Sequence, residues 1–95
     1  MKTFLIIYSE SNDTTQIVNR IQSIGDNINF LGNHYLVYTA DSETAQTIFD
    51  RISSGQQLTS VYVTEVSTTA QSNYWGVMNR DFWNWLVSHP NTHLE

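Results

Sequence analysis

Residues 3–9 read TFLIIYS, a run of β-branched and aromatic side chains with apolar residues on both alternations of an extended chain. A strand with one face in water would alternate apolar and polar residues, so this pattern predicts a strand that is buried on both faces. Residues 34–40 (HYLVYTA) have the same character. Both segments are therefore expected in the middle of a sheet.

A first helix is expected directly after the strand at residues 3–9. Asp13 with Gln16 three residues later is typical of a helix start, and Gly25 is typical of a helix end. The apolar stripe at helical spacing consists of Ile17, Ile21 and Ile24, widened by Val18. The sequence therefore predicts one amphipathic helix between Asp13 and Gly25.

A second helix is expected after the strand at residues 34–40. Asp41 or Ser42 is the expected N-cap, and Gly55 the expected end. Its apolar residues at helical spacing are Ala45, Ile48, Phe49 and Ile52. This segment repeats the strand-then-helix design of the first.

Two further strands complete the pattern. Residues 28–31 (INFL) form a short apolar run, which Gly32 and Asn33 join to the strand at 34–40 by a tight hairpin turn. Residues 58–66 (LTSVYVTEV) alternate and are β-branched. The resulting order is strand, helix, strand, strand, helix, strand.

This order predicts an α+β domain of the ferredoxin-like βαββαβ type. Short connections and the handedness of crossovers favour a four-stranded antiparallel sheet in the order 4-1-3-2, with both helices on one face. The chain is long enough for one hydrophobic core, so residues 1–93 are expected to form a single domain. Leu94 and Glu95 resemble the remnant of a purification tag and are excluded from the fold.

An aromatic tail follows the fourth strand. Residues 79–89 are expected to form a helix that Pro90 ends, with Phe82, Trp85, Leu86 and His89 on one face. The tail is expected either to close the open face of the chain's own sheet or to bind a second subunit, and the second reading is favoured. The expected interface residues are Trp75, Phe82, Trp83, Trp85 and Leu86.

Composition excludes several classes of function. The chain has no cysteine, which removes thiolate metal sites, disulfides and cysteine nucleophiles. Its net charge is −5, and the four basic residues are scattered, so nucleic acid is a disfavoured partner. The longest apolar run is too short to span a bilayer or to form a signal peptide, so a cytoplasmic location without membrane contact is expected.

The order of elements, the YLVYT strand at residues 35–39, the DSET start at residues 41–44 and the WNWL tail at residues 83–86 carry a resemblance. The chain resembles the small ferredoxin-like proteins called the SinR family, which are similar to the CRISPR-associated small ribonuclease and spacer-integration subunit. The resemblance implies a homodimer. Active nucleases of that group carry an aspartate at the end of the first strand, where this chain has Tyr8, Ser9 and Glu10.

Three residues are the catalytic candidates. In the expected sheet, Glu10 and Asp13 follow the first strand near the start of the third, where His34 lies. A carboxylate beside an imidazole can bind a hard metal such as magnesium or share a proton in phosphodiester hydrolysis. The simpler interpretation is that Asp13 caps a helix, Glu10 is a solvated loop charge and His34 belongs to the hairpin.

Two other patterns have weaker functional interpretations. The strands carry tyrosines that could stack bases if they lay on the open face: Tyr8, Tyr35, Tyr38 and Tyr62. His89 and His93 have the spacing of helical metal ligands, but Pro90 lies between them and breaks the helix. No metal site and no bound cofactor are therefore expected.

These observations favour a small dimerising protein-interaction domain, or a regulatory or antitoxin-like one, with a protein partner. The alternative is a metal-dependent endoribonuclease or deoxyribonuclease that resembles the CRISPR-associated nucleases and uses magnesium. The sequence leaves open whether the chain is an enzyme.

Overall fold

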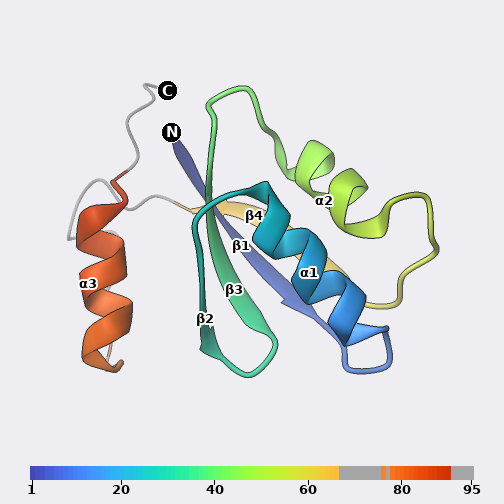
Figure 1. Cartoon of the computed structure of the whole chain (residues 1–95), viewed down its shortest axis with the longest axis horizontal. Helices are drawn as coiled ribbons and strands as arrows, with labels where there is room; N and C mark the ends of the chain where they lie inside the picture. Colours follow the sequence, from blue (N-terminus) through green and yellow to red (C-terminus); the bar gives the residue numbers. More distant parts are fainter. Residues whose placement is uncertain (67–75, 77, 91–95) are drawn as a thin grey trace.

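The computed structural model describes residues 1–66, 76 and 78–90, shown in colour in Figure 1. Its elements alternate as expected, with a third helix after the last strand. They are β1 (Lys2–Tyr8), α1 (Thr14–Ile24), β2 (Asn27–Leu31), β3 (His34–Thr39), α2 (Ala45–Ser53), β4 (Val61–Val66) and α3 (Arg80–Ser88).

The four strands form one antiparallel sheet in the order β2-β3-β1-β4, which reads 4-1-3-2 when it is counted from the β4 edge. The prediction that the two segments apolar on both alternations lie in the centre is confirmed, because β1 pairs with both β3 and β4. The chain is therefore a small α+β fold with helices packed on a sheet.

One face of the sheet is covered by α1 and α2 (Figure 1). The main core lies between these two helices and the sheet. From β1, this face presents Phe4, Ile6 and Tyr8. The other buried members of the core are Ile17, Ile21, Tyr35, Val37, Ile48 and Ile52. Of the predicted stripe of the first helix, Ile17 and Ile21 are fully buried, and Val18 and Ile24 are partly buried and pack against the cluster.

The opposite face, here called the open face, carries the alternate residues of each strand. In β1 these are Thr3, Leu5 and Ile7, because neighbours on one face of an antiparallel sheet are directly opposite residues. Their partners on β3 are Tyr38, Leu36 and His34, and those on β4 are Val66, Thr64 and Tyr62. From β2, Ile28 lies opposite Leu36.

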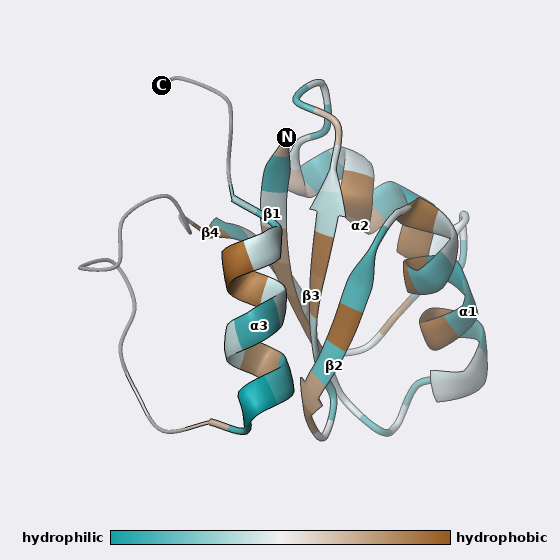
Figure 2. Ribbon diagram, turned by 60° about the vertical axis from the view of Figure 1, so that its left-hand side comes forward, coloured by the Kyte–Doolittle hydropathy of each residue, from teal (hydrophilic) through white to brown (hydrophobic). Residues whose placement is uncertain are grey.

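Helix α3 packs on the β2 and β3 part of the open face (Figure 2). Near its start, the ring centroid of Phe82 lies 5.0 Å from that of Phe30. Near its end, the ring of His89 meets the ring of Tyr38 edge-on, also at 5.0 Å. Of the α3 side chains, Leu86 is the most deeply buried. The predicted helix at residues 79–89 is thus present, with Asn79 and His89 as its caps.

The prediction that Asp41 or Ser42 is the N-cap of α2 was wrong. Thr44 is the cap, because its hydroxyl accepts from the Thr47 backbone N–H while the Thr47 hydroxyl accepts from the Thr44 N–H. This reciprocal pair satisfies two helix-end donors, which Asp41 or Ser42 could not reach from three and two residues further out. Asp41 instead forms an ion pair with the N-terminal ammonium group.

The fourth strand begins at Val61 and not at Leu58. Ser60 has a φ angle of 51°, a left-handed conformation that interrupts an extended chain. Thr59 is held outside the sheet by Asn12, whose side chain accepts from the Thr59 N–H at 2.8 Å and donates to the Thr59 carbonyl at 2.6 Å. A contact across 47 residues therefore sets the start of this strand.

Thr3 supplies a first prediction. Its side chain is fully buried, and its hydroxyl oxygen makes no hydrogen bond in the described part of the chain. Since an unsatisfied buried hydroxyl loses its hydration without compensation, Thr3→Val should raise the free energy of unfolding by about 1 kcal/mol. Urea denaturation followed by circular dichroism measures this change. A destabilised variant would show that the hydroxyl is satisfied.

Candidate functional site

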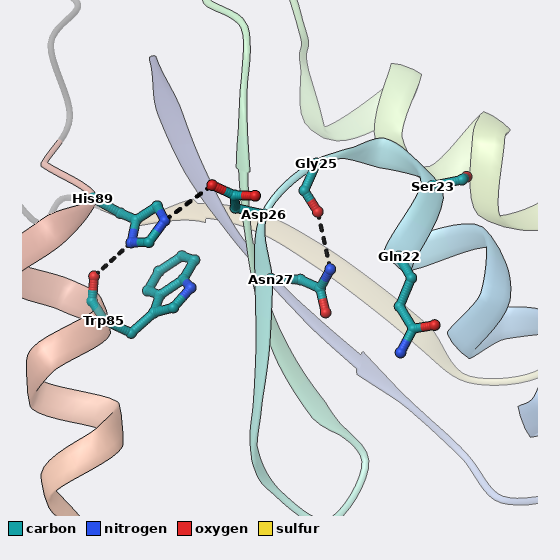
Figure 3. A pocket seen from close by; sticks show the side chains of 7 residues that line it. All are labelled: Gln22, Ser23, Gly25, Asp26, Asn27, Trp85 and His89. Atoms are coloured by element: carbon teal, nitrogen blue, oxygen red, sulfur yellow. Dashed lines mark hydrogen bonds and ion pairs between the residues drawn. The ribbon is translucent and has the colours of Figure 1, made fainter.

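A groove lies where the end of α3 meets the connection between α1 and β2 (Figure 3). Its volume is about 600 Å³, within the range of about 300 to 1,000 Å³ that is usual for small-molecule sites. It is open to solvent, and its lining is mostly polar. The lining residues are Gln22, Ser23, Gly25, Asp26, Asn27, Trp85 and His89.

Residues 25–27 form the floor of the groove and run beside β3. The Asp26 carbonyl accepts from the Tyr38 N–H at 2.8 Å. The Asn27 side-chain amide donates to the Gly25 carbonyl at 2.9 Å, as Figure 3 shows. Because the backbone of residues 25–27 is tied at both points, the Asp26 carboxylate has a defined position at the rim, where it remains 77% exposed.

His89 contacts several groups around the groove. Its ring stacks on the indole of Trp85, with centroids 4.1 Å apart and planes inclined by 14°. Its Nδ1 lies 2.8 Å from the Trp85 carbonyl oxygen, and its Nε2 lies 3.3 Å from a carboxylate oxygen of Asp26. His89 therefore joins the end of α3 to the α1–β2 connection, 63 residues earlier in the chain.

The partners of the two His89 ring nitrogens differ in their hydrogen-bonding chemistry. A carbonyl and a carboxylate both accept hydrogen bonds, whereas a neutral imidazole has one donor and one acceptor. Only the imidazolium ion can donate to both atoms at once. The Ser88 hydroxyl, 3.0 Å from Nδ1, can adapt to either state.

The structure does not bring the three catalytic candidates together. Asp13 is the N-cap of α1 and accepts from the Gln16 N–H at 3.2 Å. His34 lies opposite Ile7 on the open face, with its Nδ1 2.9 Å from the Leu31 carbonyl oxygen. Within the described ranges, which contain Glu10 as well, no group of three His, Asp or Glu side chains could hold a metal ion.

Glu10 influences a different pair of residues. Burial raises the pKa of Tyr8, and the neighbouring Tyr35 and Glu10 raise that pKa further. The rings of Tyr8 and Tyr35 stack at 6.3 Å on the helix-covered face. Glu10 is thus close enough to this buried tyrosine pair to affect the Tyr8 hydroxyl.

The same geometry limits the base-stacking hypothesis. Tyr8 and Tyr35 belong to the core under α1 and α2, and Tyr38 is covered by the end of α3, where its hydroxyl donates to the Pro90 carbonyl at 2.6 Å. Of the four strand tyrosines, Tyr62 alone is largely exposed, at 61%. These residues do not form the row of exposed rings that stacking on single-stranded RNA requires.

The predicted interface residues have separate positions on α3. Phe82 and Leu86 face the sheet, and Trp85 lines the groove. Trp83 donates from its indole nitrogen to the Met78 carbonyl at 3.2 Å and packs against Phe82. Trp75 lies outside the described residues, as do His93 and the Leu94–Glu95 pair. The aromatic side chains of α3 that the structure describes therefore all have contacts within this chain.

Sequence reasoning did not assign a role to Asp26, and it gave His89 no ligand role because Pro90 follows it. The available signal was that His89 lies seven residues after Phe82, on the same helical face as Leu86. That position predicts contact with the sheet. The partner carboxylate could not be found from spacing, because it is contributed by a turn at the opposite end of the chain.

Comparisons with protein-family models, with curated proteins and with solved structures found no significant match. Among residues 1–66, 76 and 78–90, no helix is both long enough and apolar enough to cross a bilayer.

Proposed function

We propose that this chain is a homodimerising protein-interaction domain, in which two copies bury the part of the open sheet face beside α3. The observation that carries the proposal is the chemistry of that face. It carries no Asp, Glu, Lys or Arg on any of the four strands, although the chain has a net charge of −5. Like-charge repulsion between two copies is therefore weakest here.

Among the described residues, one helix lies on the open face. Neighbouring strands lie about 4.8 Å apart and a helix with its side chains is about 10 Å wide, so one helix covers about two strands. On the opposite face, α1 and α2 together cover the sheet. On the open face, the described residues include one helix, α3, which contacts mainly β2. The part of the open face that belongs to β1 and β4 is here called the floor.

The exposed side of α3 that carries Val87, here called the ridge, lies beside this floor. Successive helical residues are about 100° apart, so Val87 points nearly opposite to His89. Since His89 faces the groove beyond the β2 edge, Val87 faces the β1 and β4 side. Val87 is 70% exposed, and Tyr62 on β4 is 61% exposed. Val87 and Tyr62 are thus two exposed side chains on neighbouring parts of this surface.

A second copy fits this surface because ridge and floor are complementary. A two-fold axis would place the ridge of each protomer over the floor of the other, so both would be buried by one contact. The chain's own packing shows which chemistry the face accepts, since Phe82 and Leu86 already cover its β2 and β3 half. An apolar helix flank is therefore the favoured occupant.

Substitution of Val87 or Tyr62 by glutamate should dissociate the dimer. Each change would bury an unpaired carboxylate in the contact, which should weaken the dimerisation constant by about 100-fold or more. Sedimentation equilibrium of the wild-type chain and of Val87→Glu and Tyr62→Glu measures this constant.

Gln46→Glu is the matched control, because it adds the same charge at an exposed position of α2, on the other face. It should leave the constant unchanged. A wild-type chain that is monomeric at all accessible concentrations would refute the proposal, and so would a dimer that is insensitive to both open-face substitutions.

The finer assignments are part of the same proposal. The βαββαβ order with β1 and β3 in the centre supports a ferredoxin-like fold similar to the SinR family. A regulatory or antitoxin-like role in the cytoplasm would follow from a partner bound by the dimer. The nuclease alternative is less well supported, because no three His, Asp or Glu side chains of the described residues are grouped so that they could hold a metal ion.

A further inference from the structure

We infer that the outer edge of β2 binds an extended segment of a partner protein, which adds a strand to the sheet and places a basic side chain beside Asp26. This surface is separate from the proposed dimer contact, which buries the part of the open face that belongs to β1 and β4. The inference therefore adds a second kind of partner and does not depend on the dimer.

The edge of β2 lies at the groove. In the part of the chain that the structure describes, β3 pairs with one side of β2 and no strand pairs with the other side. Figure 2 shows β2 as the outermost strand on that side, with α3 on one face of the sheet and α1 on the other. Asn27 of β2 lines the groove together with residues from the end of α1 and from α3. A chain laid along β2 would therefore run between two helices.

The backbone groups of Asn27 and Asn29 point out of this edge. The Tyr38 N–H donates to the Asp26 carbonyl at 2.8 Å, so Asp26 and Tyr38 form a hydrogen-bonded pair. In an antiparallel ladder, hydrogen-bonded and non-hydrogen-bonded pairs alternate. The pairs that Asn27 and Asn29 form with β3 are therefore of the second kind. Their N–H and C=O groups are directed away from β3, toward the position of an added strand.

The start of β2 lacks the features that usually protect an edge strand. Natural edges are blunted by proline, by lysine or other charged side chains, or by bulges. The β2 sequence NINFL contains neither proline nor a charged residue. Its register shift lies between Asn29 and Leu31, at the end away from the groove. Residues 27–29 therefore remain regular and able to pair with a short extended segment.

The charge at the groove favours a basic segment. No Lys or Arg lines the groove, and the Asp26 carboxylate at its rim is 77% exposed. Its Oδ2 faces His89, and its Oδ1 accepts no hydrogen bond from the described residues. The whole chain has a net charge of −5. An arginine or lysine side chain is therefore attracted to this edge, and an acidic segment is repelled.

A designed peptide tests the added strand. The probe is a capped six-residue peptide of alternating threonine and valine with one central arginine. Nuclear magnetic resonance should show downfield shifts of the Asn27 and Asn29 amide protons and about tenfold slower exchange of both with solvent, because they become hydrogen-bonded. The same peptide with alternate nitrogens methylated lacks the donors and should bind at least about tenfold more weakly.

Two substitutions separate the backbone contact from the charge. Asn27→Pro removes an outward N–H that does not bond to β3, so it should weaken binding about tenfold and leave the fold intact. Asn27→Ala is the matched control, because it loses the same side chain but keeps the N–H. Asp26→Lys should reverse the preference, so that a peptide with central glutamate binds better than the arginine peptide.

The outcomes are distinct from those of the dimer test. Tyr62→Glu should bind the arginine peptide as the wild-type chain does, whether or not it dissociates a dimer. Unchanged Asn27 and Asn29 resonances at millimolar peptide would overturn the inference, and so would equal binding of the methylated peptide. Protection of both amides that rises with protein concentration without peptide would also overturn it, because a second copy would then occupy the edge.

Discussion

Replacement of Gly25 by alanine is expected to destabilise the protein by about 3 kcal/mol, as overpacking at a site that cannot relax. A Cβ atom at this position would overlap the carbonyl oxygen of Tyr38. That oxygen belongs to the central strand β3, and the next peptide is tied to the same residue by the Tyr38 N–H. Neither side of the contact can move without loss of sheet pairing.

The expected loss of stability in Gly25→Ala comes from a steric clash and not from an unfavourable backbone conformation. Its φ angle of 172° is extended, which any residue can adopt. Gly55 is the matched control, since it has a φ angle of 81° with nothing within 4 Å of an added Cβ. Gly55→Ala should cost only about 1 kcal/mol, the usual penalty for alanine in the left-handed region. Urea denaturation of both variants separates the two effects, and equal losses would contradict this explanation.

Phe4→Ala should have the largest effect, a loss of about 4 kcal/mol in the free energy of unfolding. Phe4 is completely buried at the centre of the sheet, between Val37 on β3 and Glu65 on β4. Removal of its ring would leave a cavity beneath α1 and α2. Since total stability of a domain of this size is only about 5 to 15 kcal/mol, much of the native state would be lost.

Leu5→Ala is the neighbouring control. Leu5 is half-buried and points to the open face, away from α1 and α2. Its truncation should cost about 2 kcal/mol or less, because fewer contacts are removed. Chemical denaturation at a concentration where the chain is monomeric gives both values. A larger loss for Leu5 than for Phe4 would show that the main core lies on the open side.

The helices and strands that could be predicted from sequence are those whose apolar residues recur at a regular spacing. The stripe of Ile17 and Ile21 lies against the sheet as its spacing requires, and residues 3–9 and 34–40 are central. The helix and strand boundaries that were predicted wrongly depend on specific side-chain hydrogen bonds. The start of α2 is set by two threonine hydroxyls, and the start of β4 by Asn12, which is distant in sequence.

The candidate site shows the same limit. The expected sheet placed Glu10 near His34. In the structure Glu10 is a turn residue near Tyr8, whereas His34 lies opposite Ile7 on the open face. The groove that does form combines Asp26 with His89. No periodic signal links these residues, because their approach follows from where α3 docks.

By itself, the amino-acid order determined the strands, the amphipathic helices and the uncharged character of one sheet face, because burial of apolar side chains acts on local periodicity. The tertiary structure alone decided that α3 covers β2 and β3, that Gly25 lies against Tyr38 and that His89 meets Asp26. These contacts join segments that are far apart in the chain, and they form only when the packing of the whole fold brings their side chains within reach.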